Sequence, residues 1–300
     1  MDLRQMEYFV ALAEESQFTR AAEITRVSQS GLSAAIKSLE QDLNAKLFTR
    51  TTRSVELTPA GRALVPHARN LLAEATAGRD AVTATVGEVT GSLHVGAEQC
   101  LGSINVPELV ERFHRRHREV EIRFTQAGTG DLLSRMRDGE IDLAFVAGTP
   151  DTADPRLRLT GLDHATLATE PLVLLTPPDD PLASRKSVTW EDLQARTYID
   201  LEGSWAIRMI TDELFATRKI PRRVAFTVGD IHALIDMLHR GLGIAVVPQS
   251  VARKTIAAEL RAIQVVDQAN PTWTVSAAFP HHEKGSTLAT EFLSLLEPRL

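Results

Sequence analysis

The apolar positions at the start of the chain predict three short helices. Residues 3–13 and 18–24 each carry apolar side chains at helical spacing, with a short break between the two runs. A third helix is expected after Ser28, a residue type that caps helix N-termini. Its apolar face repeats in steps of four, three and four at Leu32, Ile36, Leu39 and Leu43. Thr19 is the expected cap of the second helix, and the short segment 25–27 makes the second and third helices a helix-turn-helix candidate.

A hairpin and a long helix are expected next. Residues 47–57 give two short segments about a polar tip, which predicts a small β-hairpin with Arg50 and Arg53 at or near its tip. Thr58 and Pro59 supply a cap and a first helical residue. From residue 59 to about residue 89, apolar or small residues recur in steps of three and four at Leu64, Ala68, Leu71, Ala75, Gly78, Val82, Val86 and Val89. Such a seam favours a coiled-coil contact between two copies of the chain, and packing of the helix on its own domain is the alternative.

From residue 91 onward the pattern alternates between strands and helices. Residues 141–147 form a nearly continuous apolar run, which is typical of a buried parallel strand. Other strands are expected near residues 93–96, 120–124, 172–176, 198–201, 224–228, 243–247 and 272–279. This alternation predicts an α/β fold with a mostly parallel sheet. Breaks that carry proline or glycine near residues 160–163 and 267–271 predict two lobes, the first of residues 91–162 and 268–300 and the second of residues 163–267.

Composition narrows the classes of protein that fit. The chain has 300 residues, 43% of them hydrophobic and 24% charged, which is typical of a folded protein of about two domains and argues against disorder. No stretch approaches the roughly 18 apolar residues of a membrane span, and residues 1–10 do not resemble a secretory signal. Cys100 is the one cysteine of the sequence, which excludes an intramolecular disulfide and a CxxC motif. A cytoplasmic location is therefore expected.

The distribution of charge matters more than its total. A formal net charge of −6 argues against a nucleic acid partner, because a basic face is the usual electrostatic footprint of one. Within residues 20–53, however, six basic residues outweigh three acidic ones, a local net charge of +3. The six are Arg20, Arg26, Lys37, Lys46, Arg50 and Arg53. A small basic footprint is thus expected on the helix-turn-helix candidate and the hairpin.

A series of short motifs runs along the chain in a fixed order. The N-terminal ones are LRQMEYFVALAEE at 3–15, FTRAA at 18–22, VSQ at 27–29 and LTPAG at 57–61. Later ones are GSLHVG at 91–96, GEIDLA at 139–144 and GLGIAVVP at 241–248. Each motif alone is weak, but together and in register they resemble the LysR-type transcriptional regulator family over the whole chain.

The resemblance implies a definite order of parts. These are a winged helix-turn-helix DNA-binding domain at 1–60, a linker and dimerisation helix at 61–90, and an effector-binding domain at 91–300 with two α/β lobes similar to periplasmic binding proteins. It implies a sequence-specific regulator of transcription that is controlled by a small-molecule effector bound between the lobes. The implied partners are double-stranded operator DNA with inverted half-sites and further copies of the chain, as a homodimer through the linker helix and a homotetramer. No cofactor, metal or membrane contact is expected.

The expected DNA contacts lie on one face of the third helix and on the hairpin. They are Gln29, Ser30, Ser33, Ala34, Lys37, Arg50 and Arg53. Glutamine can read adenine edges, serine a base or a phosphate, and lysine guanine or a phosphate, whereas an alanine can touch only a thymine methyl group. With alanines at positions 34 and 35, we expect less direct base readout than is usual and more dependence on DNA shape and on the hairpin.

The expected effector contacts follow the strands of the α/β part, because ligands bind beyond the carboxyl ends of such strands. They are Gln99, Cys100, Leu101, Thr129, Gly148, Thr149, Glu202, Gly203, Ser204 and Asp230. Residues 99–102 come before a helix, so their N–H groups are expected to face an anion. The Thr, Gly, Ser, Glu and Asp residues of this set are equally typical of helix caps and turns. If Glu202 and Asp230 both line the cleft, a dianionic effector is disfavoured.

Cys100 has two open interpretations. It is either a small buried thiol that packs, or an effector contact or reactive thiol at a helix N-terminus, where the thiolate is favoured. Two rival functions also remain open: a cytoplasmic ligand-binding sensor whose N-terminal domain docks a protein rather than DNA, and an enzyme that uses the cleft. An enzyme is not expected, because GxSxG and HExxH motifs are absent and Gly241 and Gly243 lack the third glycine of a dinucleotide site. The sequence around the histidines at positions 114, 117, 281 and 282 does not indicate a metal site.

Overall fold

A computed structural model describes residues 1–50, 55–85, 90–102, 104–149, 152–266, 272–281 and 287–296 of the chain. The chain divides into two compact units, and each is described by itself. Unit one comprises Met1–Gly91 with Arg137–Glu140, and unit two comprises Ser92–Met136 with Ile141–Leu300. The helix-turn-helix, the hairpin and the long helix lie in unit one, and the α/β part lies in unit two.

Three short helices begin unit one: α1 Leu3–Glu15, α2 Phe18–Ile24 and α3 Gln29–Asp42. Ser28 caps α3 as predicted, because its Oγ accepts a hydrogen bond of 3.1 Å from the Gly31 N–H. The predicted cap of α2 is wrong. Gln17 is the N-cap residue, without a side-chain hydrogen bond, and Thr19 lies inside the helix. Phe18 packs against the core and is already helical, so Thr19 comes too late in the turn to act as a cap.

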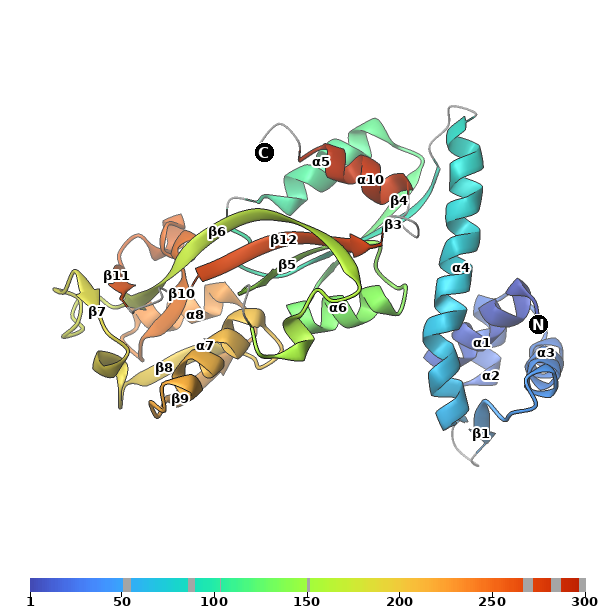
Figure 1. The fold of residues 1–300 in the computed structure, drawn as a ribbon, viewed down its shortest axis with the longest axis horizontal. Helices are drawn as coiled ribbons and strands as arrows, with labels where there is room; N and C mark the ends of the chain where they lie inside the picture. The colour runs from blue at the N-terminus through green and yellow to red at the C-terminus, as the bar shows by residue number, and fades with distance from the viewer. Residues whose placement is uncertain are drawn as a thin grey trace. The chain divides into compact units, whose positions relative to one another are not determined.

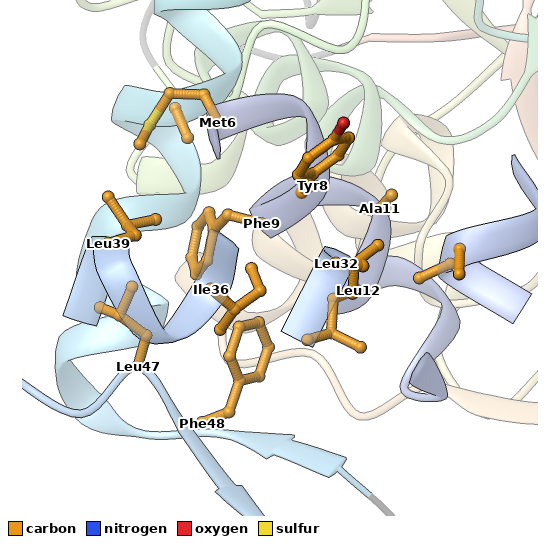
Figure 2. Close-up of a cluster of buried hydrophobic side chains, with 13 residues drawn as sticks. Met6, Tyr8, Phe9, Ala11, Leu12, Leu32, Ile36, Leu39, Leu47 and Phe48 are labelled. Atoms are coloured by element: carbon orange, nitrogen blue, oxygen red, sulfur yellow. The ribbon is translucent and has the colours of Figure 1, made fainter. Parts of the chain in front are cut away.

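One apolar core joins these helices to the hairpin (Figure 2). Its buried side chains are Met6, Tyr8, Phe9, Ala11, Leu12, Ala21, Ala22, Leu32, Ile36, Leu39, Leu47, Phe48 and Ala68. The Phe9 and Phe48 rings lie 5.4 Å apart between centroids, so the hairpin is held against α1 by an aromatic contact. Three of the apolar positions predicted for α3, at residues 32, 36 and 39, are thus buried, which leaves the opposite face of this helix outward.

The hairpin consists of β1 Phe48–Arg50 and β2 Val55–Leu57, which pair antiparallel with Phe48 opposite Leu57. The predicted hairpin is therefore confirmed. The side chain of Arg50 and all of Arg53 lie outside the described residues, so their expected position at the tip remains a prediction.

The long helix α4 spans Pro59–Thr85. Thr58 precedes it, and its Oγ1 accepts a hydrogen bond of 3.0 Å from the Gly61 N–H, as the capping pattern predicted. Ala68 is fully buried in the core of unit one, whereas Leu71 and Val82 are 43% and 67% exposed. The start of the predicted seam thus packs on its own domain, and apolar side chains stay exposed further along the helix. The seam positions 86 and 89 lie outside the described residues.

Unit two contains two lobes. Lobe one is built from β3 Gly91–Ala97, α5 Val106–Arg116, β4 Val120–Gln126, α6 Thr129–Arg137, β5 Leu143–Gly148, β12 Thr272–Pro280 and α10 Thr287–Ser294. Lobe two is built from β7 Ser187–Val188, β8 Thr197–Leu201, α7 Ala206–Thr217, β9 Arg223–Val228, α8 Ile231–His239, β10 Ala245–Pro248, α9 Gln249–Ala252 and β11 Arg261–Val265. Short 3-10 turns lie at Pro155–Leu157, Glu191–Leu193 and Thr255–Ala257.

One long strand, β6 Leu162–Thr176, belongs to both lobes (Figure 1). It pairs with β12 from Leu162 to Pro171 and with β10 and β11 from Leu172 to Thr176. The sequence predicted a break near residues 160–163, and a turn at residues 160–161 does precede the strand. The sequence also placed a lobe boundary at residue 163, whereas the partners of the strand change only after Pro171. Residues 162–170 are mostly polar and half exposed, so they lack the apolar run that marked other strands.

The large sheet has the strand order β4-β3-β5-β12-β6-β11-β7, and β10 also pairs with β6. β3 and β5 are parallel, but β12 is antiparallel to both β5 and β6, and β10 and β11 are antiparallel to β6. The expectation of a mostly parallel sheet is therefore wrong. The reason is that β6 and β12 run in opposite directions side by side through the middle of the sheet.

Candidate functional site

The outward face of α3 carries the predicted DNA contacts of this helix. Gln29, Ser30, Ala34 and Lys37 are exposed, and Ser33 is half-buried. The side chains that alternate with them point into the core of unit one, so burial fixes which face of α3 is presented to a partner. The structure thus brings five of the seven predicted residues together on one face.

Glu40 holds the hairpin in position against α3. Its Oε1 accepts hydrogen bonds from the backbone N–H groups of Leu47 and Phe48 at 2.9 and 3.3 Å, and its Oε2 accepts one of 2.7 Å from Lys46 Nζ. Burial raises the pKa of this carboxyl group. The hydrogen bonds from Lys46 and the two backbone groups together lower it by more than burial raises it, so the pKa lies below its ordinary value. A charged Glu40 therefore links α3 to the start of the hairpin.

Glu98 is a buried carboxyl group in unit two that the sequence analysis did not single out. It directly follows β3 and is 2% exposed. Its Oε2 accepts hydrogen bonds from the Thr129 N–H at 2.6 Å and from Thr129 Oγ1 at 2.9 Å, and its Oε1 accepts one from the Gln99 N–H at 3.2 Å. The sequence signal that could have identified Glu98 is an acidic residue directly after an apolar strand.

The protonation of Glu98 reflects a balance between burial and hydrogen bonding. Burial raises its pKa, while the hydrogen bonds from Thr129 and Gln99 lower it, and the result is a pKa of about 8. The charged and neutral forms of Glu98 are therefore both populated near neutral pH.

Gln99 and Thr129 are committed to contacts within the protein. Gln99 Nε2 donates to the Gly229 carbonyl at 3.1 Å, and its Oε1 accepts from the Ile231 N–H at 3.0 Å, so this side chain joins lobe one to the start of α8. Thr129 Oγ1 contacts Glu98. It also contacts the N–H and the carbonyl group of Ala147, both at 3.0 Å. Both were predicted as effector contacts, but the side chains of both form hydrogen bonds with other groups of the protein.

Cys100 does not lie at a helix N-terminus. Helix α5 begins at Val106 behind its cap Asn105, several residues further along the chain. The Cys100 carbonyl accepts a hydrogen bond of 2.9 Å from Trp273 Nε1, and its φ of 60° is left-handed. Burial, followed by the charges of Glu98 and Glu170, raises the pKa of the thiol to about 12. The structure therefore favours the packing interpretation over a reactive thiolate.

A pocket of about 570 Å³ lies in lobe one. Its lining includes Thr129, Gly148 and Thr149 from the predicted set, together with Arg158 and His164. Seven of the described lining residues carry hydroxyl groups, and none of the described lining residues is Asp or Glu. The pocket therefore offers hydrogen-bond donors and basic groups without an opposing carboxylate.

The remaining predicted effector contacts are not among the residues that line this pocket. Glu202, Gly203 and Ser204 are exposed in the loop after β8, and Leu101 is buried. Asp230 caps α8, because its Oδ1 accepts hydrogen bonds from the N–H groups of residues 232 and 233 at 2.8 and 2.9 Å. The structure thus gathers three of the ten predicted residues in one pocket. Since Glu202 and Asp230 are not among its lining residues, they do not disfavour an acidic ligand there.

Comparison with known proteins agrees with this architecture. Residues 3–62 match the family described as bacterial regulatory helix-turn-helix protein, lysR family, and residues 87–300 match the LysR substrate binding domain. The chain is 34% identical over 250 residues to the HTH-type transcriptional regulator ShiR from Corynebacterium glutamicum (strain R), with 82% of each chain covered.

Two solved structures are similar over the full chain. Full-length OxyR from Pseudomonas aeruginosa matches with a TM-score of 0.73 and 26% identity, covering 100% of this chain and 94% of that chain. Full-length CbnR complexed with its target DNA matches with a TM-score of 0.61 and 25% identity, covering 100% of both. No helix among the described residues is long and apolar enough to cross a membrane. The chain belongs to the LysR family of bacterial transcriptional regulators, with a DNA-binding helix-turn-helix followed by an effector-binding domain.

Proposed function

We propose that this regulator recognises its operator through the outward face of α3 and the hairpin, and that it responds to a small molecule bound in the lobe-one pocket. The observation that supports the DNA contact is the exposure of Gln29, Ala34 and Lys37 on the face of α3 that is opposite the core. Arg50 and Arg53 complete the proposed interface from the hairpin. The rival function, a sensor that docks a protein through the same face, is not favoured by the family match.

Substitution on α3 is expected to weaken operator binding in two distinguishable ways. Lys37→Ala removes a phosphate or guanine contact and should weaken binding to all related sequences, whereas Gln29→Ala should relax the preference at one base pair, each by about 1–3 kcal/mol. A gel-shift titration on the DNA that flanks the coding region, with single base-pair changes, measures both effects.

Lys186→Ala is the matched control, because Lys186 is exposed in lobe two and its loss changes the net charge equally. If neither variant on α3 differs from Lys186→Ala, the assignment of this face to DNA is wrong. Binding of the full chain to no flanking DNA at all would instead favour the rival function.

The pocket favours a small molecule with an anionic group and several hydrogen-bonding atoms. Arg158 and His164 supply basic groups, and the threonines and Ser276 supply donors and acceptors. Apolar lining by Val146, Leu157 and Leu162 would cover the carbon skeleton of such a ligand. We therefore place the effector in this pocket rather than against the loop of Glu202.

A thermal-shift panel of monocarboxylates, dicarboxylates and neutral polyols at equal ionic strength tests the pocket. Carboxylates are expected to raise the unfolding temperature of the full chain, because a ligand that binds only the folded state stabilises it. Arg158→Gln should reduce this shift, whereas Arg156→Gln should leave it intact, since Arg156 forms an ion pair with Asp154 and does not line the pocket. An equal shift in both variants would contradict the assignment.

The assembly is proposed to be a homodimer through α4 and then a homotetramer. Exposed Leu71 and Val82 on α4 are the side chains that would meet the partner copy. We further propose a cytoplasmic regulator without catalytic activity, which the regulatory function of its relatives supports.

A further inference from the structure

The floor of the lobe-one pocket is a patch of sheet formed by three neighbouring strands. β5, β12 and β6 lie side by side in the large sheet (Figure 1). Ser276 of β12 pairs with Thr166 of β6 on one side and with Val146 of β5 on the other. Residues directly opposite each other in paired strands project from the same face of a sheet. All three line the pocket, so the hydroxyl groups of Ser276 and Thr166 are neighbours on its floor.

Ser276 lies on a face of the sheet that otherwise forms an apolar core. Ala144, Val146 and Ala278 project from the same face and are buried together with Leu132 of α6. Ser276 is itself only 5% exposed. None of the described residues forms a hydrogen bond with its Oγ atom, although buried hydroxyl groups usually have a partner. Since this hydroxyl group faces the pocket, a polar group of a ligand is its expected partner.

Two other hydroxyl groups of the lining are already committed to the protein. Thr129 Oγ1 is held by the hydrogen bonds described above. Thr152 Oγ1 donates to Glu213 Oε2 at 3.1 Å, and the N–H of the next residue donates to Glu213 Oε1 at 2.9 Å. Glu213 belongs to α7, so lobe two fixes this wall of the pocket. These two threonines therefore shape the pocket, whereas Ser276 and Thr166 can read the ligand.

The basic groups of the pocket lie close to the hydroxyl groups of its floor. His164 comes two residues before Thr166 on the same face of β6, roughly 7 Å along the strand. Arg158 lines the pocket from the segment between β5 and β6. A carboxylate matches the basic side chains, and ligand hydroxyl groups, which both donate and accept, match those of serine and threonine.

We propose that the effector is a polyhydroxylated carboxylate and that Ser276 selects for its hydroxyl groups. This inference rests on the proposed effector pocket and names the class of compound that fills it. An acid without hydroxyl groups would displace water from Ser276 and leave the serine hydroxyl buried without a partner. A site that pairs a buried polar group with its ligand discriminates strongly against analogues that lack the matching group.

Calorimetric titration of the full-length protein with matched sodium salts tests the class of ligand. Gluconate and hexanoate are six-carbon open-chain acids with and without hydroxyl groups, and glucuronate and cyclohexanecarboxylate make the same comparison for ring compounds. Sorbitol supplies hydroxyl groups without a carboxylate. At least one hydroxylated acid is expected to bind about tenfold or more tightly than its partner without hydroxyl groups, and more tightly than sorbitol.

Ser276→Ala tests the selecting residue. This variant should fold like the wild type, because the hydroxyl group has no partner in the described part of the chain. It should weaken binding of the preferred hydroxylated acid at least about fivefold, and should leave binding of the partner acid unchanged or tighter. A general loss of structure would weaken both acids, so the two effects are distinguishable.

Thr176→Val is the matched control for Ser276→Ala. Thr176 is a fully buried residue of β6 whose Oγ1 also has no hydrogen-bond partner among the described residues, but it does not line the pocket. Its substitution removes the same kind of hydroxyl group and should keep the preference of the wild type.

The outcomes separate this inference from the proposed function. Equal affinities within both pairs of acids, with binding lost in Arg158→Gln, would overturn selection for hydroxyl groups and leave the pocket in place. An undiminished preference in Ser276→Ala would overturn the role of this residue. Tighter binding of sorbitol than of either hydroxylated acid would overturn the carboxylate. Binding of none of the acids would overturn the pocket, and this inference with it.

Discussion

Gly61→Ala is expected to destabilise the DNA-binding unit by about 3 kcal/mol or more, at the upper end of the usual cost of overpacking. Gly61 lies in the first turn of α4, and a Cβ atom there would overlap the Leu47 carbonyl oxygen and crowd Leu57. That carbonyl is fixed, because it accepts a hydrogen bond of 2.9 Å from the Thr58 N–H. No side-chain rotation relieves the overlap, so α4 and the hairpin must separate.

Gly78→Ala on the same helix is the matched control. A Cβ atom on Gly78 meets no atom within 4 Å, and alanine favours a helix more than glycine does, so this variant should gain about 0.4–1 kcal/mol. Hydrogen exchange of the α4 amides and operator gel shifts measure the pair. Equal stability of the two variants would show that the contact at Leu47 is not close.

Asp200→Ala is expected to destabilise lobe two by about 3–5 kcal/mol, because it removes the one buried carboxylate paired with a buried cation and leaves that cation only the exposed Asp212. The side chains of Asp200 and Arg222 are 4% and 5% exposed, and Asp200 Oδ2 lies 2.5 Å from Arg222 Nη2. The guanidinium carbon of Arg222 also lies 5.1 Å from the centroid of the Phe215 ring, so it cannot reach water without disturbing the core. Urea unfolding followed by the fluorescence of Trp190, a buried residue of lobe two, reports the loss.

Asp212 provides the comparison for this network. Its side chain also pairs with Arg222, at 2.7 Å, but is 50% exposed. Solvent screens such a pair, so Asp212→Ala should cost about 1 kcal/mol or less. The double variant Asp200→Leu with Arg222→Leu should be more stable than Asp200→Ala, because it leaves no buried cation that has lost its buried partner. A double variant less stable than Asp200→Ala would contradict this explanation.

The features predicted correctly from the sequence are those set by local interactions. Ser28 and Thr58 lie at helix starts because their hydroxyl groups reach N–H groups three residues later. The apolar steps of α3 predicted which face is buried, and therefore which residues can face DNA. The predicted cap Thr19 shows the limit of such signals. Phe18 packs against the core as the first residue of α2, so the helix begins before Thr19.

The features that the sequence did not predict depend on contacts between distant residues. The first part of β6 is polar, and it is a strand because β12 pairs with it from more than a hundred positions away. Glu98 was not singled out because its partner Thr129 comes from a later helix. The effector candidates were chosen by their place after strands, a rule that does not say which of them will face inward. Those that face a partner within the protein, such as Gln99 and Asp230, could not be told from ligand contacts.

The continuity of β6 constrains how an effector can act on this domain. A rotation of lobe two relative to lobe one must twist or bend one hydrogen-bonded strand rather than move a slack loop. Pro171, where the pairing partners change, has no backbone N–H, so the strand gives up a potential hydrogen bond at the position where a bend is required. The domain is therefore suited to small rotations that return elastically when the ligand leaves, and not to a wide opening of the lobes.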